Sequence, residues 1–459
     1  LYYDEDPRPW LFPILLCFLI GLMLLLRYRS PEVTRPTEAM FIVATAWLVM
    51  AIMGAIPFVM YGMGVVDALF EAMSGFTTTG SSIMSDIESW PKSILFWRSF
   101  TQWLGGAGVI MVFVTVLPML GVGGRNLFKN EFPGLDVQNF SARIQEEARK
   151  FHYIYGFFSL AMLVLLLLTG IGVYDSLCVM FSTVSTGGLS PHSESIAYYA
   201  SASVEWIVII FMFLAATNFY LHFQAITTRD PYRFFRSSEF RLYLGIVLAA
   251  TAAITAFLWG KEFSDLGDGV RTSMFHVVSL MTSTGFATAN YIAWDQAVVF
   301  LLLALIVIGG STGSTAGGIK VARFFLTYKF IASALHKTVH PRSIFTVKLD
   351  GRPLSEEALS SVVAMVMCYF ATALVAVVTL ILAGVDPVTS VSAAVTSLSN
   401  CGPGLGMLGP YGSFGPLPVI AKLILTFTMW AGRLEFISVL VLFTPVFWRE
   451  LMRYRERYV

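Results

Sequence analysis

The sequence predicts an all-α polytopic membrane protein, with four tandem helix–pore-helix–filter-loop–helix repeats around one pore and an extra N-terminal helix. Of its 459 residues, 56% are hydrophobic and only 13% are charged, whereas a soluble domain carries about one-quarter charged residues. Several apolar runs reach the roughly 20 residues that cross a bilayer. A Thr/Gly turn after a short apolar segment occurs four times, and such periodicity indicates a repeat architecture.

The four turns share their surroundings: a long apolar segment, a short one, the turn, and another long segment. The aligned glycines Gly80, Gly187, Gly285 and Gly402 are 107, 98 and 117 residues apart. One such turn alone would be a plain link between helices. The residues predicted to line the turns are Thr78, Thr79, Gly80, Ser185, Thr186, Gly187, Ser283, Thr284, Gly285, Asn400, Cys401 and Gly402.

The long apolar segments divide the chain. Residues 10–27 form the extra helix, in a region assigned to 1–35, and the repeats are assigned to 36–124, 125–228, 229–340 and 341–459. Nine segments are long enough to span the membrane. Within the repeats they are expected at 38–62, 94–118, 151–172, 203–226, 241–259, 297–335, 358–383 and 417–446.

Lysine and arginine predict the orientation. They are concentrated in the segments between repeats and at the C-terminus, and they are sparser in the loops within repeats. By the positive-inside rule, the linkers and the C-terminus are cytoplasmic and the turns open to the outside. The basic residues are Arg27, Arg29, Arg35, Arg125, Lys129, Arg143, Arg149, Lys150, Arg229, Arg233, Arg236, Arg241, Lys337, Arg342, Lys348, Arg352, Arg449, Arg453, Arg455 and Arg457.

The short apolar segments, of about ten to fourteen residues, are typical of re-entrant pore helices because they are too short to span. Each begins near an acid (Asp67, Asp175, Asp268 or Asp386) that is expected to cap the first-turn amides. Pro387 suits the first helical position. No carboxylate occupies the turns, so their carbonyls and hydroxyls are predicted to replace the water shell of a cation.

The four turns, together with Val339-His340-Pro341-Arg342 and Gly432-Arg433-Leu434-Glu435, resemble the Trk/Ktr/HKT cation transporters over nearly the whole chain. The nearest resemblance is to the bacterial Trk potassium uptake membrane subunit. It implies K⁺ as the transported ion, an inner-membrane homodimer, and a cytosolic, TrkA-like nucleotide-binding regulatory ring. A glycine in every turn matches the K⁺-selective members, whereas Cys401 is unusual beside a filter glycine.

Residues 297–335 are too long for one crossing and are interrupted by a Gly-rich loop, residues 309–318, which includes Gly310, Gly313, Gly317 and Gly318. A phosphate-binding loop is excluded because Ile319 stands where lysine is required. A kink without a role is one interpretation. The other is an intramembrane gate beneath the filter, anchored by Lys320 and Arg323, and the resemblance also implies a gating loop here.

Arg433 is expected near the middle of the segment 417–446, where it must face protein or water. Glu435 is a poor partner within the same helix, being only two residues away. One interpretation is a structural pair with an acid or carbonyls of another helix. The other places the guanidinium beside the ion path, holding the Gly-rich loop through its carbonyls.

Other functions are less consistent with the sequence. No GxSxG or HExxH motif is present, the six histidines are scattered, and the four cysteines read as free thiols, so no enzyme, metal centre or nucleic-acid partner is expected. Two transport classes remain: a channel-like protein, and a secondary transporter with Na⁺ or H⁺ symport at a midplane site. Four parallel repeats, each with its own turn, favour the first.

Overall fold

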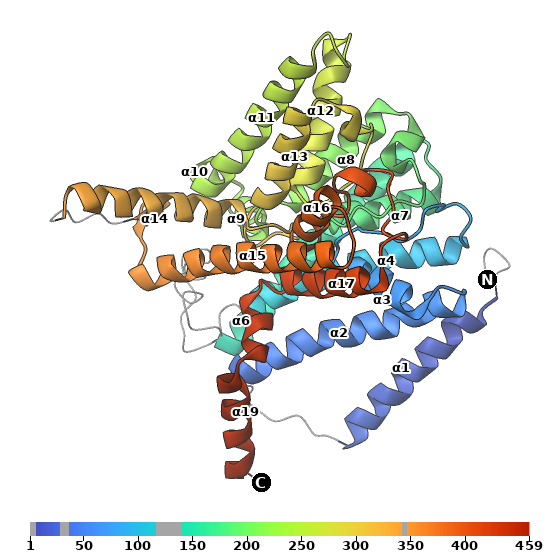
Figure 1. The fold of residues 1–459 in the computed structure, drawn as a ribbon, viewed down its shortest axis with the longest axis vertical. Coiled ribbons are helices and arrows are strands. Elements are labelled where there is room, and N and C mark those ends of the chain that lie inside the picture. The colour runs from blue at the N-terminus through green and yellow to red at the C-terminus, as the bar shows by residue number, and fades with distance from the viewer. Residues whose placement is uncertain (1–5, 28–35, 116–139, 342–346, 459) are drawn as a thin grey trace.

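The computed structural model of the chain describes residues 6–27, 36–115, 140–341 and 347–458. Within them the chain is mainly helical, with one two-stranded antiparallel hairpin (Figure 1). The elements are α1 (Arg8–Arg27), α2 (Pro36–Met60), α3 (Val65–Phe76), α4 (Lys92–Thr115), α6 (Phe140–Leu168), α7 (Val173–Val184), η3 (Ser195–Tyr199), α8 (Ala202–Ala215), α9 (Phe219–Thr228), α10 (Arg233–Arg236), α11 (Ser238–Leu258), α12 (Leu266–Met281), η4 (Tyr291–Ala293), α13 (Gln296–Ile308), α14 (Val321–Val339), β1 (Lys348–Leu349), β2 (Arg352–Pro353), α15 (Glu356–Leu382), α16 (Pro387–Leu398), η5 (Gly406–Leu408), α17 (Val419–Arg433), α18 (Ile437–Leu440), η6 (Val441–Phe443) and α19 (Pro445–Tyr458). The predicted boundary at residues 124 and 125, and the linker residues Arg125, Lys129 and Arg342, lie outside the described residues.

Five of these helices are long and apolar enough to span a membrane, and α8 with α9 makes a sixth if the bent pair is one span. The sequence predicts nine segments long enough to span, with 297–335 expected to be interrupted, and this number exceeds the five or six found in the described part of the chain. The second long segment of repeats two, three and four is broken in each case: α8 and α9 meet at 94°, α13 and α14 are separated by the Gly-rich loop, and α17 ends at Arg433. Helix α4 is described only as far as Thr115, so the predicted segment 94–118 is not described in full.

The short helices α3, α7, α12 and α16 were predicted from their length, and each leads into one of the four turns. Each packs against the two longer elements of its own predicted repeat. Each also contacts the helix that follows the turn of the preceding repeat: α7 lies on α4, α12 on α8, α16 on α13, and α3 on α17. These contacts run around the molecule in chain order and close between the first and last repeats.

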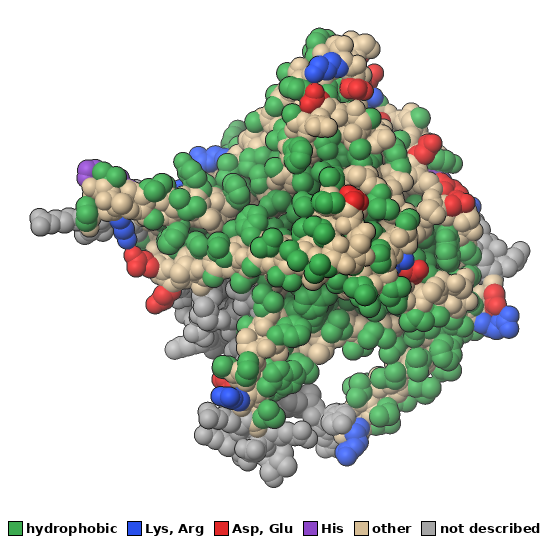
Figure 2. Space-filling view, viewed as in Figure 1, with side chains coloured by type: hydrophobic (Ala, Val, Ile, Leu, Met, Phe, Trp, Pro, Cys, Tyr) green, Lys and Arg blue, Asp and Glu red, His purple; other side chains and the backbone are tan. Residues whose placement is uncertain are grey.

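The outer surface is suited to lipid. Figure 2 shows apolar side chains over most of the visible face, with charged side chains gathered towards its margins. Leu25 and Leu168 are each 77% exposed, and Leu382 is 80% exposed. Helix α14 extends away from the body as an arm, and α19 continues to the C-terminal end (Figure 1).

Candidate functional site: four turns that meet

The four turns have one backbone conformation. In each, the second residue after the short helix has a left-handed φ, although none of these residues is glycine. The residues are Thr78, Thr186, Ser283 and Asn400, with φ of 51°, 55°, 59° and 50°. The residue that follows donates its amide to the carbonyl five positions earlier, from Thr79 to Ser74 and from Gly187 to Ser182, and likewise in the other two turns.

This backbone register corrects the alignment made from sequence. Because Gly187 takes the place of Thr79, the glycine equivalent to Gly80 in the second turn is Gly188. Gly188 also has a positive φ of 78°, close to 83° at Gly80 and 84° at Gly285. The second turn carries two adjacent glycines, and the sequence alone offers no basis for choosing between them. From here the ring glycines are Gly80, Gly188, Gly285 and Gly402.

The ring glycines bring the turns into contact in a closed cycle. A Cβ atom at any of them would collide with the next turn. The obstructing groups are the Gly187 carbonyl at Gly80, the Thr284 carbonyl at Gly188, Pro403 at Gly285, and the Gly80 carbonyl at Gly402. Only residues without a side chain allow so close an approach of backbones. Four segments separated by about a hundred residues in sequence thus surround one axis.

The side chains of the turns are almost entirely buried and bond within the site. The hydroxyls of Thr77 and Thr79 lie 2.8 Å apart, and those of Thr282 and Thr284 lie 2.7 Å apart. Asn400 Nδ2 donates to Thr79 Oγ1 at 3.1 Å, which joins the fourth turn to the first. Cys401 is fully buried. All four cysteines are free thiols.

A cavity opens above the ring. All four ring glycines line it, together with Arg98 and His192 from the first and second predicted repeats. At its margin Glu88 accepts from the Ser193 amide at 2.8 Å and also from the Ser193 hydroxyl. Burial raises the pKa of the Glu88 carboxyl, but these hydrogen bonds outweigh it and leave the pKa below its ordinary value. A carboxylate therefore stays ionised at the edge of this cavity.

The acids at the starts of the short helices have different roles. Asp386 caps α16 as predicted, accepting from the Thr389 amide at 3.0 Å. The prediction was wrong for the others. The N-cap of α12 is Asp265 rather than Asp268, while Asp67 and Asp175 lie in first turns that follow the N-caps Gly64 and Gly172. A first-turn carboxylate still interacts favourably with the helix dipole.

The Gly-rich loop lies directly beneath the turns. The Gly317 amide donates to Ser283 Oγ at 2.6 Å, and the Gly318 amide donates to the Ser399 carbonyl at 3.1 Å. The loop also explains the break between α8 and α9. Unwinding there frees the Ala216 carbonyl to accept from the Ser311 amide at 2.9 Å, and the Thr315 hydroxyl donates to the Ala215 carbonyl at 3.1 Å.

Arg433 reaches the same loop. Its Nη1 donates to the Thr315 carbonyl at 2.8 Å, which is the type of bond expected from the sequence. Its position differs from the prediction, because Arg433 is the last residue of α17 and not the middle of a longer helix. The next residues turn sharply, with φ of 59° at Glu435 and 53° at Phe436. That turn carries the Glu435 carboxylate to Arg323 at 2.6 Å.

Sequence reasoning missed several charged and polar residues that brace the site. Glu239, at the start of α11, accepts from the Thr312 amide at 2.6 Å and from its hydroxyl at 2.9 Å. Gln102 donates to the Gly187 carbonyl at 2.7 Å, and Glu71 and Arg98 form a buried ion pair behind the first turn. A charge inside an apolar segment is the signal that would have found Glu71 and Arg98. Glu239 falls in a segment that the sequence predicts to be a charged linker, where a further charge carries no such signal.

Known proteins match this chain over nearly its whole length. The sequence profile of the TrkH family, described as a cation transport protein, matches residues 12–260 and 261–449. The Trk system potassium uptake protein TrkH of Escherichia coli K12 is 35% identical over 98% of this chain and 94% of its own length. TrkH of Salmonella typhimurium is 36% identical over 92% and 88%, and TrkG of Escherichia coli K12 is 33% identical over 90% and 86%.

A solved structure agrees with these relatives. The crystal structure of the potassium transporter TrkH from Vibrio parahaemolyticus superposes with a TM-score of 0.89 at 32% identity, covering 97% of this chain and 94% of that one. Sequence and structure therefore match over nearly the full length of both chains. On these grounds the chain belongs to the TrkH family of cation transport proteins.

Proposed function

We propose that this chain carries K⁺ across the cell inner membrane through a passage lined by the four glycine turns. The observation that carries the proposal is the closed cycle of ring glycines, in which four backbones meet without side chains between them. Backbone carbonyls and hydroxyls at such a constriction replace the hydration shell of a cation. The relatives are named as potassium uptake proteins and as a potassium transporter, and these names support K⁺ as that cation.

The proposed architecture is four parallel repeats around this passage, with the boundaries given above and an extra helix at the N-terminal end. Its support is the cyclic packing of the short helices α3, α7, α12 and α16. The filter is formed by the turn residues, from Thr78–Gly80 to Asn400–Gly402, with Gly188 in place of Gly187 on the ring. The basic linkers favour an arrangement in which the C-terminus is cytoplasmic.

The proposed gate is the Gly-rich loop with Lys320 and Arg433. It closes the passage beneath the filter through bonds to the third and fourth turns and to the α8–α9 break. Arg433 strengthens the barrier in two ways: it holds the Thr315 carbonyl, and its positive charge opposes a cation in the cavity beside Asn400. Opening then requires the loop to move, while the ring stays in place.

The proposed partners are a second copy of the chain and a cytosolic nucleotide-binding regulatory ring. For the ring, the support is the family and the basic residues near the loop. Arg233, Arg236 and Arg323 line a cavity that also includes Glu239 and Thr312, so a partner that engages these residues would act on the gate. Co-purification from native membranes tests it, and recovery without any nucleotide-binding protein contradicts it.

The experiment that tests the transport proposal is flux into sealed vesicles containing the purified protein. K⁺ and Rb⁺ are expected to pass faster than Na⁺ and Li⁺, and the flux is expected to follow the K⁺ gradient alone. A strict requirement for a Na⁺ or H⁺ gradient, with fixed stoichiometry, would replace the channel-like mechanism by symport. Equal rates for all four ions would refute a selective ring.

A further inference from the structure

Behind the first turn lies a buried ion pair. Arg98 Nε of α4 donates to Glu71 Oε1 of α3 at 2.7 Å, and the two side chains are 1% and 0% exposed. Charges buried in a membrane protein are costly and usually face the interior or a water-filled path. The pair lies next to such a path, because Arg98 lines the cavity above the ring glycines.

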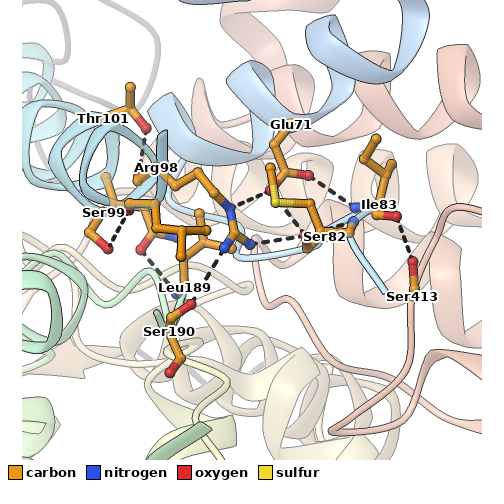
Figure 3. A network of polar contacts seen from close by, with 12 residues as sticks. Glu71, Ser82, Ile83, Arg98, Ser99, Thr101, Leu189, Ser190 and Ser413 are labelled. Atoms are coloured by element: carbon orange, nitrogen blue, oxygen red, sulfur yellow. Dashed lines mark hydrogen bonds and ion pairs between the residues drawn. The ribbon is translucent and has the colours of Figure 1, made fainter. Parts of the chain in front are cut away.

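The pair holds the loop segment that leaves the first turn, residues 81–84. Arg98 Nη2 donates to Ser82 Oγ at 2.9 Å, and Ser82 Oγ in turn donates to Glu71 Oε1 at 3.0 Å. The Ile83 amide donates to Glu71 Oε2 at 2.9 Å. Figure 3 shows the Arg98 guanidinium between the Glu71 carboxylate and the loop segment that contains Ser82. Both carboxylate oxygens of Glu71 therefore bond Ser82 or Ile83, which lie two and three residues after Gly80.

The same network reaches the other turns. Arg98 Nη1 approaches the Ser190 carbonyl, just beyond the second turn, at 3.4 Å (Figure 3). From the fourth predicted repeat, the Phe414 amide donates to the Ser82 carbonyl at 2.9 Å, and Ser413 Oγ donates to the Ile83 carbonyl at 2.8 Å. The pair thus holds Ser82 and Ile83, and through them and Ser190 it is linked to the loops that follow three of the turns.

This arrangement puts an arginine at the entrance of a cation passage. A guanidinium stays charged at any working pH, so on its own it would repel the ion that the ring is built to bind. We propose that Glu71 and Arg98 form a specificity- and affinity-determining pair. Arg98 holds the loop segments at Ser82 and Ser190, and Glu71 neutralises the charge of Arg98 so that K⁺ still enters. The inference rests on the proposed function, because it describes the same passage.

The test measures K⁺ uptake against K⁺ concentration in vesicles containing Glu71→Gln, Arg98→Met or the double variant. Glutamine keeps an acceptor for Ser82 or Ile83 but leaves Arg98 uncompensated. At an effective dielectric constant of about 20, a unit charge about 10 Å away changes a cation's binding constant by roughly tenfold. Glu71→Gln is expected to raise the half-saturating K⁺ concentration by about that factor, with little change in flux at saturation.

The double variant distinguishes the effect of an uncompensated charge from the effect of lost hydrogen bonds. Because it buries no net charge, it is expected to return the half-saturating concentration to within about threefold of the wild-type value. Its lost hydrogen bonds are expected to appear instead as weaker K⁺/Na⁺ discrimination. A double variant as impaired in K⁺ affinity as Glu71→Gln would overturn the electrostatic argument, as would wild-type affinity in Glu71→Gln itself.

The matched control is Glu205→Gln. Glu205 of α8 pairs with Arg271 of the short helix α12 at 2.8 Å. Arg271 lies in the N-terminal half of α12, whereas the third turn follows its C-terminal end. Glu205→Gln is expected to leave K⁺ affinity unchanged. If Glu71→Gln fails to fold, the half-saturating K⁺ concentration of the double variant decides, and a value more than about threefold above wild type overturns the proposal. Absence of K⁺ flux in the wild type would refute the proposed function instead, and so is distinguishable from failure of this inference.

Discussion

A methyl group at residue 188 is a sharp test of which glycine belongs to the ring. Gly188 has φ of 78°, and a Cβ there would collide with the Thr284 carbonyl, a backbone atom that moves only if the neighbouring turn moves. A left-handed conformation costs alanine about 1–2 kcal/mol. If that strain is relieved by displacing the ring, the loss corresponds to roughly a 5- to 30-fold fall in K⁺/Na⁺ discrimination.

The adjacent Gly187→Ala substitution is the matched control. Its φ is not in the left-handed region, and its Cβ would meet the end of the flexible Gln102 side chain, with Nε2 and Oε1 both 2.6 Å away. We expect it to shift Gln102 and to retain most of the discrimination. The assay compares K⁺ and Na⁺ flux in vesicles, with thermal unfolding as a check on folding. Full discrimination in Gly188→Ala together with loss in Gly187→Ala would refute the register.

Three further predictions concern the gate. Deleting residues 310–317 should raise K⁺ flux without altering ion preference, and the gap should close readily because the Ile319 and Lys320 amides bond the Val307 and Ile308 carbonyls at 3.0 and 2.9 Å; unchanged flux in a folded deletion would show that the loop is no barrier. Arg433→Gln should raise flux by about tenfold or more, since a lost charge-assisted hydrogen bond amounts to about 1.5–3 kcal/mol. Wild-type flux and gating in a stable protein would contradict its role in the gate. Glu239→Gln should loosen the loop at Thr312 and increase the fraction of time in the conducting state in single-channel recordings, and a decrease would contradict it.

The helical class, the short helices and the turns could be predicted because each depends on local sequence. Run length separates a span from a re-entrant helix, and glycine with threonine marks the turn that follows. The choice between Gly187 and Gly188 could not be made in this way. It depends on which amide bonds the Ser182 carbonyl and on what lies across the axis, and both are tertiary facts.

The broken helices escaped prediction for a related reason. Apolar residues continue through 203–226 and 417–446, so hydropathy indicates uninterrupted helices. The breaks follow from partners elsewhere in the chain. The Gly-rich loop donates hydrogen bonds to the Ala215 and Ala216 carbonyls, and Arg323 forms an ion pair with Glu435. Helix termini inside a membrane are stable only where such partners satisfy the freed backbone groups.

The two sides of the ring are held by different kinds of interaction, and this difference suits a fixed filter above a movable gate. Above the ring, Glu71 and Arg98 are both buried and bond the loop residues Ser82 and Ile83. Displacing either side chain would leave the other as an unpaired buried charge. Below it, the loop is held by single hydrogen bonds from Gly317, Gly318 and Thr315 to separate elements, and by charge-assisted bonds to Arg433 and Glu239. Each neutral bond is worth about 0.5–1.5 kcal/mol and each charge-assisted bond about 1.5–3 kcal/mol, and because they go to separate elements they can be broken one at a time. A pull on α14, which begins directly after the loop and extends outward, would therefore release the gate before it disturbed the filter.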